Sequence, residues 1–441
     1  MGITGDLAKF VVETEFEDLP ENVVSEGKRA FLNWMGVAIG ASRHPSVEIV
    51  LSVAKEIGGK QEASILGRRE RTDILFAALI NGMSSHIFDY DDTHLETVIH
   101  PSAPVAPVVM ALGEKFRLPG RQALTAFILG IEVECLIGRM VYPSHYDTGW
   151  HITATVGNMG AAAAAGKLLK LDVHKMTQAL SLAATQASGF REMFGTMTKP
   201  FHPGKAAMNG LLAAILAGRG FTSSTGGIEA PRGFAAVTSS EKDWEKVLDG
   251  MGKRFETLNN SYKPYACGVV SHPIIDACIR LRDEHNISYA KIREINITVN
   301  PLVVELTGKT DPQTGLEGKF SSYHSAAVAL IDGEAGVAQY TDERVKSPEV
   351  AELRRKIKFS PQPQIRKDEC ILAARLAEGP EIRLHVEHAK GSLENPMTDI
   401  DLQKKFISLT KDILAGHRAA QLIEMIGELD NLNDISAIIP N

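Results

Sequence analysis

Apolar residues between about residue 5 and residue 220 recur at the three- and four-residue spacing of an amphipathic helix, with almost no period-two alternation. This spacing predicts helices over 21–41, 71–88, 121–141, 156–171, 174–187 and 205–220. The stretches 156–171 and 205–220 are rich in alanine and glycine. Because small side chains let two helices pack closely, we expect these helices to form a dense core.

The pattern changes near residue 260. Between residues 292 and 301, isoleucine and valine alternate with polar residues until a proline ends the run, which predicts a strand. Residues 370–391 contain two further apolar runs around the turn sequence EGPE, and these predict a β-hairpin. A helical segment is predicted over 323–333, and helical spacing returns after about residue 396.

These changes predict a mainly α fold. A large all-α helical domain would comprise about residues 1–259 and be completed by residues 396–441. A smaller α+β domain, about 260–395, would be inserted into it. A chain of 441 residues is long enough for two or three domains with ample core.

Charge and composition exclude several classes of protein. The formal net charge is −7 and no basic block occurs, so a nucleic-acid partner is not expected. No apolar run approaches the ~18–20 residues that span a bilayer, and the N-terminal stretch lacks the basic start and apolar core of a signal peptide. The four cysteines lie far apart without a CxxC pair, which signals neither a zinc site nor an iron–sulfur cluster. We therefore expect a cytoplasmic protein with reduced thiols.

Residues 86–102, HIFDYDDTHLETVIHPS, concentrate three aspartates, one glutamate and three histidines. Three interpretations are open: a polar loop between helices, a divalent metal site, or part of an acid/base site. Loops that bind hard cations usually place their ligands at alternate positions around a glycine, and this stretch contains no glycine. Its adjacent Asp91 and Asp92 should point apart, and one of them could simply cap a turn.

Two more clusters carry proton-transfer groups. His151 precedes an alanine-rich helix and is flanked by glycine and hydroxyl residues, a setting that suits a bound carboxylate or phosphate. The alternative is a core histidine bonded to a backbone carbonyl. Lys199 and His202 each precede a proline, and residues before proline favour extended backbone. We therefore expect both on a stiff, extended loop leading into the helix from Lys205.

Residues 260–273 and 318–330 carry further candidates, among them Lys263, His272 and Tyr323. Half of the 14 histidines fall between residues 86 and 202. No nucleophile elbow, P-loop or dinucleotide-binding motif is present. Histidines and lysines beside helix N-termini suit an anionic di- or tricarboxylate, and groups with tunable pKa values suit proton removal next to a carboxylate.

In this order, the clusters resemble the MmgE/PrpD family, which includes 2-methylcitrate dehydratase, cis-aconitate decarboxylase and iminodisuccinate epimerase. The matching blocks are NGMSSHIFDYDDTH, HPSAPVAPVVMALGE, GWHITATVGNMGAAAAAGKLLKL, MTKPFHPGKAAMNGLLAAILA and KPYACGVVSHP. The resemblance implies a large helical domain with a smaller α+β lid, a homodimer, and a site in the cleft between the domains. It also implies catalysis with no metal and no organic cofactor.

The site residues follow from the same blocks. Lys199, Lys263 and His100 would hold substrate carboxylates, and His151 would move the proton alpha to a carboxylate. Members of the family often carry arginine after the HPG motif, where this sequence has Lys205, which keeps the charge but loses the planar fork. Predicted catalytic residues are His151, Asp89, Lys199, Tyr146 and Tyr323; predicted substrate-binding residues are Thr93, His100, Lys263, His202 and His272. Asp91, Asp92 and His94 are interpreted as loop structure.

The expected function is that of a lyase, a dehydratase or decarboxylase of a citrate-, methylcitrate- or cis-aconitate-like acid. One alternative is an epimerase of an iminodisuccinate-like dicarboxylate, which needs acid/base groups on both faces of its substrate. Others are a non-catalytic carboxylate-binding protein and a metal-dependent hydratase that uses the Asp/His stretch. Substrate choice depends on a handful of side chains and is not predicted.

Overall fold

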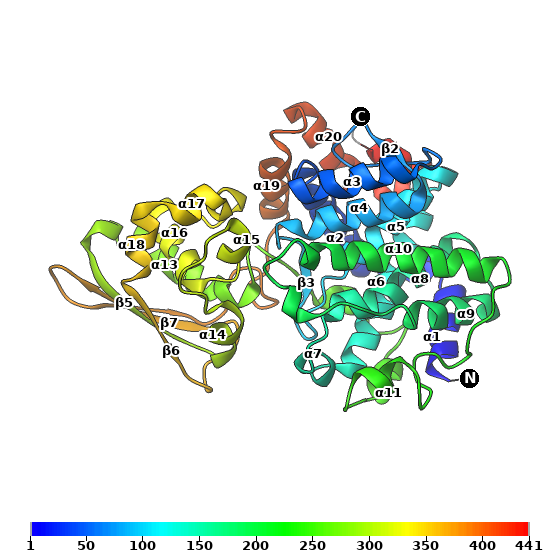
Figure 1. The fold of residues 1–441 in the computed structure, drawn as a ribbon, viewed down its shortest axis with the longest axis horizontal. Helices are drawn as coiled ribbons and strands as arrows, with labels where there is room; N and C mark the ends of the chain where they lie inside the picture. Colours follow the sequence, from blue (N-terminus) through cyan, green and yellow to red (C-terminus); the bar gives the residue numbers. More distant parts are fainter. Residues whose placement is uncertain (1, 440–441) are drawn as a thin grey trace. The chain divides into compact units, whose positions relative to one another are not determined.

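The computed structural model describes residues 2–439, and this part of the chain is mainly helical with small sheets (Figure 1). The predicted mainly α class is confirmed. The chain divides into two compact units. The first unit contains residues up to Ile87, residues 91–260 and the chain from Asp399 onward; the second contains Phe88–Tyr90 and Ser261–Thr398.

The first unit is built almost entirely from helices. Its helices are α1 (Ile3–Glu13), α2 (Glu21–Gly40), α3 (Pro45–Ile57), α4 (Ile74–Ile87), α5 (Ser102–Phe116), α6 (Gly120–Val141), α7 (Ser144–Asp147), α8 (Ile152–Leu168), α9 (Val173–Ala184), α10 (Thr198–Gly218), α11 (Phe234–Thr238), α12 (Glu245–Leu248), α19 (Asp399–Thr410) and α20 (Gly416–Gly427). Strands β1 (Ala63–Ser64) and β2 (Arg71–Thr72) pair antiparallel, and β3 (Asp92–His94) is a third short strand.

Helix α8 lies at the centre of this unit and packs against α6 and α10 (Figure 1). Nearly all its side chains are buried, and its middle is a run of alanines. A methyl group added at Gly210 of α10 would lie 2.5 Å from the carbonyl oxygen of Asn158 in α8. Only glycine allows so close an approach, and the expected dense core of small residues is therefore confirmed.

Three helices begin several residues away from their predicted starts. Helix α10 begins at Thr198, so Lys199 and His202 are helical and the predicted extended loop is wrong. Pro200 lies in the first turn, where the missing N–H has no intrahelical partner to lose, and this outweighs the extended preference before proline. Helix α8 begins earlier than predicted, and α4 begins later, at Ile74, because two nearby residues form β2.

The second unit combines a sheet with helices. Its helices are α13 (His272–Asp283), α14 (Pro301–Thr307), α15 (Gly315–Gly318), α16 (Ser322–Asp332), α17 (Asp342–Lys346) and α18 (Pro348–Arg354). Its strands are β5 (Ile292–Val299), β6 (Ile357–Pro361), β7 (Cys370–Leu376) and β8 (Ile382–Val386). The order is β6-β5-β7-β8, with β6 parallel to β5 and the other pairs antiparallel.

The predicted strand over 292–301 and the predicted hairpin over 370–391 are both confirmed. In the hairpin, Leu372 lies opposite Leu384 and both side chains are buried, while Arg383 and His385 are exposed. Strand β6 was not predicted, because its short run of apolar residues is no stronger than those found in loops. No helix among the described residues is long and apolar enough to cross a membrane.

Candidate active site

Four buried histidines of the first unit lie together, and we call them the histidine cluster. His86 is in the last turn of α4, His100 precedes α5, His151 occupies the N-cap position of α8, and His202 is in α10. The ring centre of His86 is 4.7 Å from that of His100 and 5.7 Å from that of His151. The rings of His151 and His202 are 5.2 Å apart. Four separate segments thus place four imidazoles in contact.

Asp91 holds one side of the histidine cluster. Its Oδ2 lies 2.7 Å from Nδ1 of His86 and 3.7 Å from Nδ1 of His100. His100 Nδ1 also lies 2.8 Å from the backbone oxygen of Asp92, and Thr93 Oγ1 is 3.3 Å away. Because a carbonyl oxygen can only accept, Nδ1 of His100 carries the hydrogen. In the neutral ring, Nε2 of His100 is then the acceptor.

Asp91, Asp92 and His94, interpreted above as loop structure, do not form a solvated loop. All three side chains are buried, and β3 contains two of the residues. A buried carboxyl group without a partner would cost free energy. His86 bonds to Asp91, and Ser102 and Asn260 donate to Asp92. The local spacing that argued for a solvated loop did not show that helices from elsewhere in the chain enclose it.

His151 and His202 are joined directly, with 3.0 Å between their Nδ1 atoms. Burial lowers the pKa of His151 well below its usual value, and the positive charges that His86, His202 and Lys199 can carry lower it further. Burial, His86 and Lys199 lower the pKa of His202 to about 4. Both rings are therefore neutral near pH 7. A neutral imidazole is the form that can accept a proton.

Lys199 supplies a buried positive charge one turn of α10 before His202. Its Nζ lies 5.5 Å from the ring centre of Phe194, whose edge meets the ring of His151. The predicted residue Tyr146 lies against the guanidinium of Arg191, with 4.1 Å between the ring centre and Cζ. The catalytic role of Tyr146 stays a prediction.

In the second unit, the structure brings together two of the predicted residues. Lys263 Nζ lies 3.1 Å from Oδ1 of Asp89 and 3.0 Å from its backbone oxygen, and both side chains are buried. Asp89 has a left-handed backbone, with φ of 50°, which few residues other than glycine, asparagine and aspartate adopt. Lys319, which the sequence did not single out, donates to the carbonyl oxygens of Phe88 and Ala266 at 2.6 and 2.7 Å.

The other two predicted residues of this unit make different contacts. Tyr323 packs edge-on against Phe359 of β6, with ring centres 4.6 Å apart. His272 packs against the ring of Tyr265 at 5.4 Å, and its Nε2 lies 3.4 Å from the backbone oxygen of Cys267. Their proposed roles toward a substrate stay predictions.

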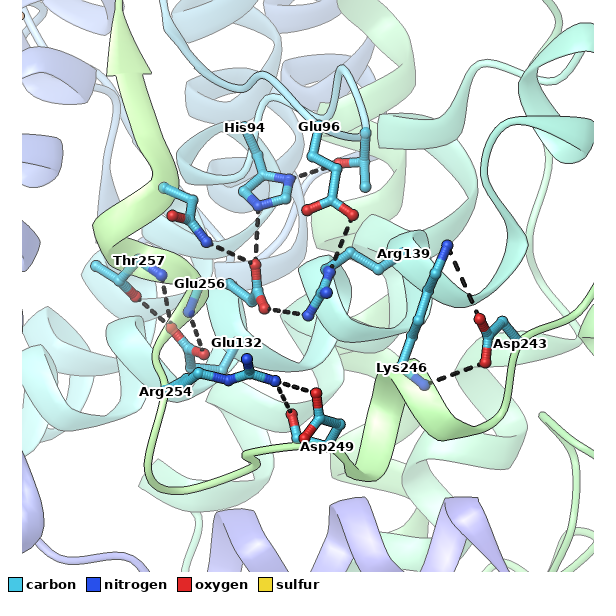
Figure 2. Close-up of polar contacts among 12 residues, drawn as sticks. His94, Glu96, Glu132, Arg139, Asp243, Lys246, Asp249, Arg254, Glu256 and Thr257 are labelled. Atoms are coloured by element: carbon cyan, nitrogen blue, oxygen red, sulfur yellow. Dashed lines mark hydrogen bonds and ion pairs between the residues drawn. The ribbon is translucent and has the colours of Figure 1, made fainter. Parts of the chain in front are cut away.

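A second polar network in the first unit, shown in Figure 2, contains residues of the types that bind metals. His94 Nε2 lies 3.0 Å from Glu256, and Arg139 lies 2.6 Å from Glu256 and 3.2 Å from Glu96. The guanidinium therefore supplies the cation between these two carboxylates. Although burial opposes it, the bonds from His94 and Arg139 hold the pKa of Glu256 at about 2. The network is structural.

Glu132 of α6 belongs to the same polar network (Figure 2). It accepts hydrogen bonds from the backbone N–H groups of Glu256 and Thr257, both at 2.8 Å, and from the Thr257 hydroxyl at 2.6 Å. Burial raises the pKa of Glu132 to about 7, and these donors oppose the rise. The segment that leads to the unit boundary at residue 260 is thereby bound to α6.

Two other buried carboxyl groups lie between β3 and the central helices. Asp92 Oδ2 accepts from Ser102 at 2.5 Å and from Asn260 at 2.6 Å, and burial raises its pKa to about 7. Within the described residues, neither carboxyl oxygen of Glu134 has a hydrogen-bond partner. Burial, with the nearby charge of Asp92, raises the pKa of Glu134 well above its usual value. Burial without a hydrogen-bond partner therefore favours the protonated, neutral form of Glu134.

The histidine cluster and Lys199 can together transfer protons to and from an anionic ligand. The neutral rings are held apart from water, and the positive charge of Lys199 attracts carboxylates. A bound polyanion would raise the pKa of the neighbouring imidazoles, because an opposite charge favours the protonated form. The cluster would thus become a better base when its ligand arrives.

Known proteins resemble this chain over most of its length. The MmgE/PrpD N-terminal domain matches residues 5–247, and the MmgE/PrpD C-terminal domain matches residues 265–431. The cis-aconitate decarboxylase of Aspergillus terreus is 26% identical over an alignment covering 99% of this chain and 95% of the fungal protein. The cis-aconitate decarboxylases of Mus musculus and Homo sapiens are each 26% identical, covering 99% of this chain and 92% and 93% of those proteins.

Proposed function

The chain belongs to the MmgE/PrpD family, and from that premise we propose that it is a lyase that transfers a proton at the carbon alpha to a carboxylate of a small di- or tricarboxylate. The first substrate to test is cis-aconitate, because the relatives described above are cis-aconitate decarboxylases. The observation that supports the proposal best is the histidine cluster beside Lys199. It combines neutral proton acceptors with a buried cation, as an acid/base reaction on a carboxylate requires.

Each predicted residue has a proposed role. His151 exchanges the proton with the substrate carbon, Lys199 and His100 bind carboxylate groups, and Thr93 orients His100. Lys263, His202 and His272 bind the substrate. Asp89 orients the substrate or the histidine, and Tyr146 and Tyr323 are the candidate second acids. The ammonium of Lys263 already faces Asp89, so we expect Lys199 to contribute more charge to substrate binding. The reaction is proposed to need neither a metal nor an organic cofactor.

The experiment is incubation of the full chain with cis-aconitate, 2-methylcitrate, citrate and iminodisuccinate in D₂O, followed by NMR. Loss of CO₂ or water, with deuterium entering alpha to a carboxylate, is the expected result. The variant His151→Asn should lose about 10²- to 10⁴-fold in kcat, the usual contribution of a positioned acid/base group. Its thermal unfolding should match the parent.

The other outcomes distinguish the alternatives. Deuterium exchange without loss of CO₂ or water would identify an epimerase instead of a lyase. Calorimetric binding of these acids without any exchange would leave a carboxylate-binding protein. Turnover that EDTA abolishes and a divalent cation restores would contradict the cofactor-free mechanism.

A further inference from the structure

We propose that His151 and His202 form a two-histidine proton relay, in which a proton taken up at Nε2 of one ring is matched by a proton released at Nε2 of the other. The hydrogen that joins the two Nδ1 atoms moves between the rings as this happens. The inference rests on the proposed function and adds to it a positioning residue, His202, that acts through His151.

The relay follows from the contact between the rings. The two Nδ1 atoms are 3.0 Å apart, so one of them donates and the other accepts. A neutral imidazole carries one hydrogen, on Nδ1 or on Nε2. The two rings must therefore be opposite tautomers: the donor has a lone pair at Nε2, and the acceptor has a hydrogen at Nε2. One ring offers a base and its neighbour offers an acid.

The surroundings keep the two rings in this contact. The backbone N–H of His151 donates to the carbonyl oxygen of Gly189 at 3.0 Å. Gly189 has φ of 120°, and a methyl group added there would lie 2.5 Å from Ala154 and 3.3 Å from Nδ1 of His202. A residue with a side chain would therefore press on both helices. The backbone of His202 is held in place by α10, the helix to which it belongs.

The charges that face the pair explain why a relay is favourable. His86, His100 and Lys199 all disfavour a positive charge on His151, and His86 and Lys199 disfavour one on His202. A single histidine acting as base would become an imidazolium beside the Lys199 ammonium. In the relay neither ring keeps the extra charge, because the second proton leaves as the first arrives.

The step balances as follows. The substrate C–H bond breaks, its electron pair stays on the substrate as an enolate, and the proton bonds to Nε2 of His151. The Nδ1–H bond of His151 breaks and that hydrogen bonds to Nδ1 of His202. The Nε2–H bond of His202 then breaks, and its proton passes to the substrate atom or the water that accepts it. The reverse sequence returns the proton.

The test is the variant His202→Asn. The asparagine amide can still bond to Nδ1 of His151, but it cannot pass a proton onward. We expect kcat to fall about 10²-fold or more, with KM within about threefold of the parent. His202→Ala should regain activity when free imidazole is added, which a purely structural residue would not show.

The matched control is His145→Asn. His145 is also a buried histidine with its pKa lowered to about 4 by burial, but it bonds to Thr155 and to the backbone of Thr238 rather than to the histidine cluster. Its kcat should stay within about twofold of the parent. A folded His202→Asn variant with parental kcat, or a folded His202→Ala variant that imidazole does not restore, would overturn the relay.

A second measurement does not depend on turnover. Nitrogen-15 NMR of histidine-labelled protein at pH 7, assigned with His151→Asn and His202→Asn, should show the two rings as neutral and opposite tautomers. Identical tautomers, or a protonated ring in the unliganded protein, would overturn the relay. Opposite tautomers in a protein that converts none of the tested acids would contradict the proposed function while supporting the relay geometry.

Discussion

At the residue scale, Asp91 and Glu134 are buried carboxyl groups in very different settings. Asp91 accepts the Nδ1–H of His86 at 2.7 Å, so its negative charge has a donor to stabilise it. Glu134 lies against the glycines of α8, with its Oε2 3.3 Å from where a methyl group on Gly157 would be. A carboxyl group surrounded by hydrocarbon keeps its proton, whereas one beside an imidazole orients that ring.

We predict that Asp91→Asn lowers kcat on the order of 10²-fold with little change in thermal unfolding. The amide keeps the shape of the side chain but removes the negative charge that holds His86, and loss of catalytic geometry has effects of this size. Steady-state kinetics would measure it. Asp147→Asn, at an exposed aspartate of α7, is the matched control and should behave like the parent. Equal kcat for both variants would mean that Asp91 serves packing alone.

We predict that Glu134→Gln becomes more stable relative to the parent as the pH rises from 5 to 8. The pKa of Glu134 in the folded protein lies well above its value in the unfolded chain. The stability that protonated Glu134 contributes to the parent is therefore complete below the unfolded pKa, and it is lost as the pH rises toward the folded pKa. The difference in unfolding free energy between the variant and the parent should change by about 1.4 kcal/mol per pH unit for one proton. Urea unfolding at both pH values would show it. A difference independent of pH would contradict a neutral Glu134.

At the element scale, helix α10 serves both the site and the core. Its first turns carry Lys199 and His202, and its glycines face the neighbouring helices. A methyl group on Gly204 would lie 2.2 Å from the carbonyl oxygen of Leu79 in α4. Because backbone atoms cannot move aside as a flexible side chain can, this contact fixes the distance between α10 and α4. The site geometry therefore depends on the small residues of the core.

We predict that Gly210→Ala destabilises the protein by about 1–3 kcal/mol, because the added methyl group overpacks the contact between α10 and the backbone of α8. Gly218→Ala in the same helix is the control. Its methyl group would meet only a side-chain atom of Leu171, at 3.3 Å, and its effect should stay within about 1 kcal/mol. Urea unfolding compares the two. Equal stability of both variants would mean that α8 and α10 can shift apart freely.

At the scale of the whole molecule, the chain leaves the first unit and returns to it at its C-terminal end. Helix α19 packs on α2, and Lys405 Nζ donates to Asn33 at 2.7 Å. Phe406 is buried against Gly36, where a methyl group would lie 2.9 Å from its ring. The first unit is therefore completed by residues that follow the entire second unit in sequence.

We predict that Phe406→Ala destabilises the first unit by about 3–5 kcal/mol, the usual cost of emptying a buried phenylalanine site. All three tryptophans, Trp34, Trp150 and Trp244, lie in the first unit, so their fluorescence during urea unfolding reports on this unit. Ile407→Ala, at a neighbouring side chain that is 46% exposed, should change stability by no more than about 0.5 kcal/mol. Equal midpoints would show that the tail is not part of this core.

The sequence by itself determined most helices, the β5 strand and the β7–β8 hairpin. Periodicity depends on residues two to four positions apart, and this information is entirely local. It also determined the residue types of the site: His151, His202, Lys199 and His100 were all singled out from their motifs. Where local rules disagreed, at Pro200 near the start of α10, position within the first turn decided the outcome.

Only the tertiary structure decided which groups are buried, paired or neutral. His86 and Asp91 are five residues apart, but the ring that stacks on His86 comes from His151, and the partner of His151 is 51 residues further along. Charge state depends on desolvation and on neighbours within a few ångströms, whatever their sequence separation. Local spacing therefore suggested a solvated loop at Asp91. In the structure, Asp91 is instead buried and bonded to His86 of the histidine cluster.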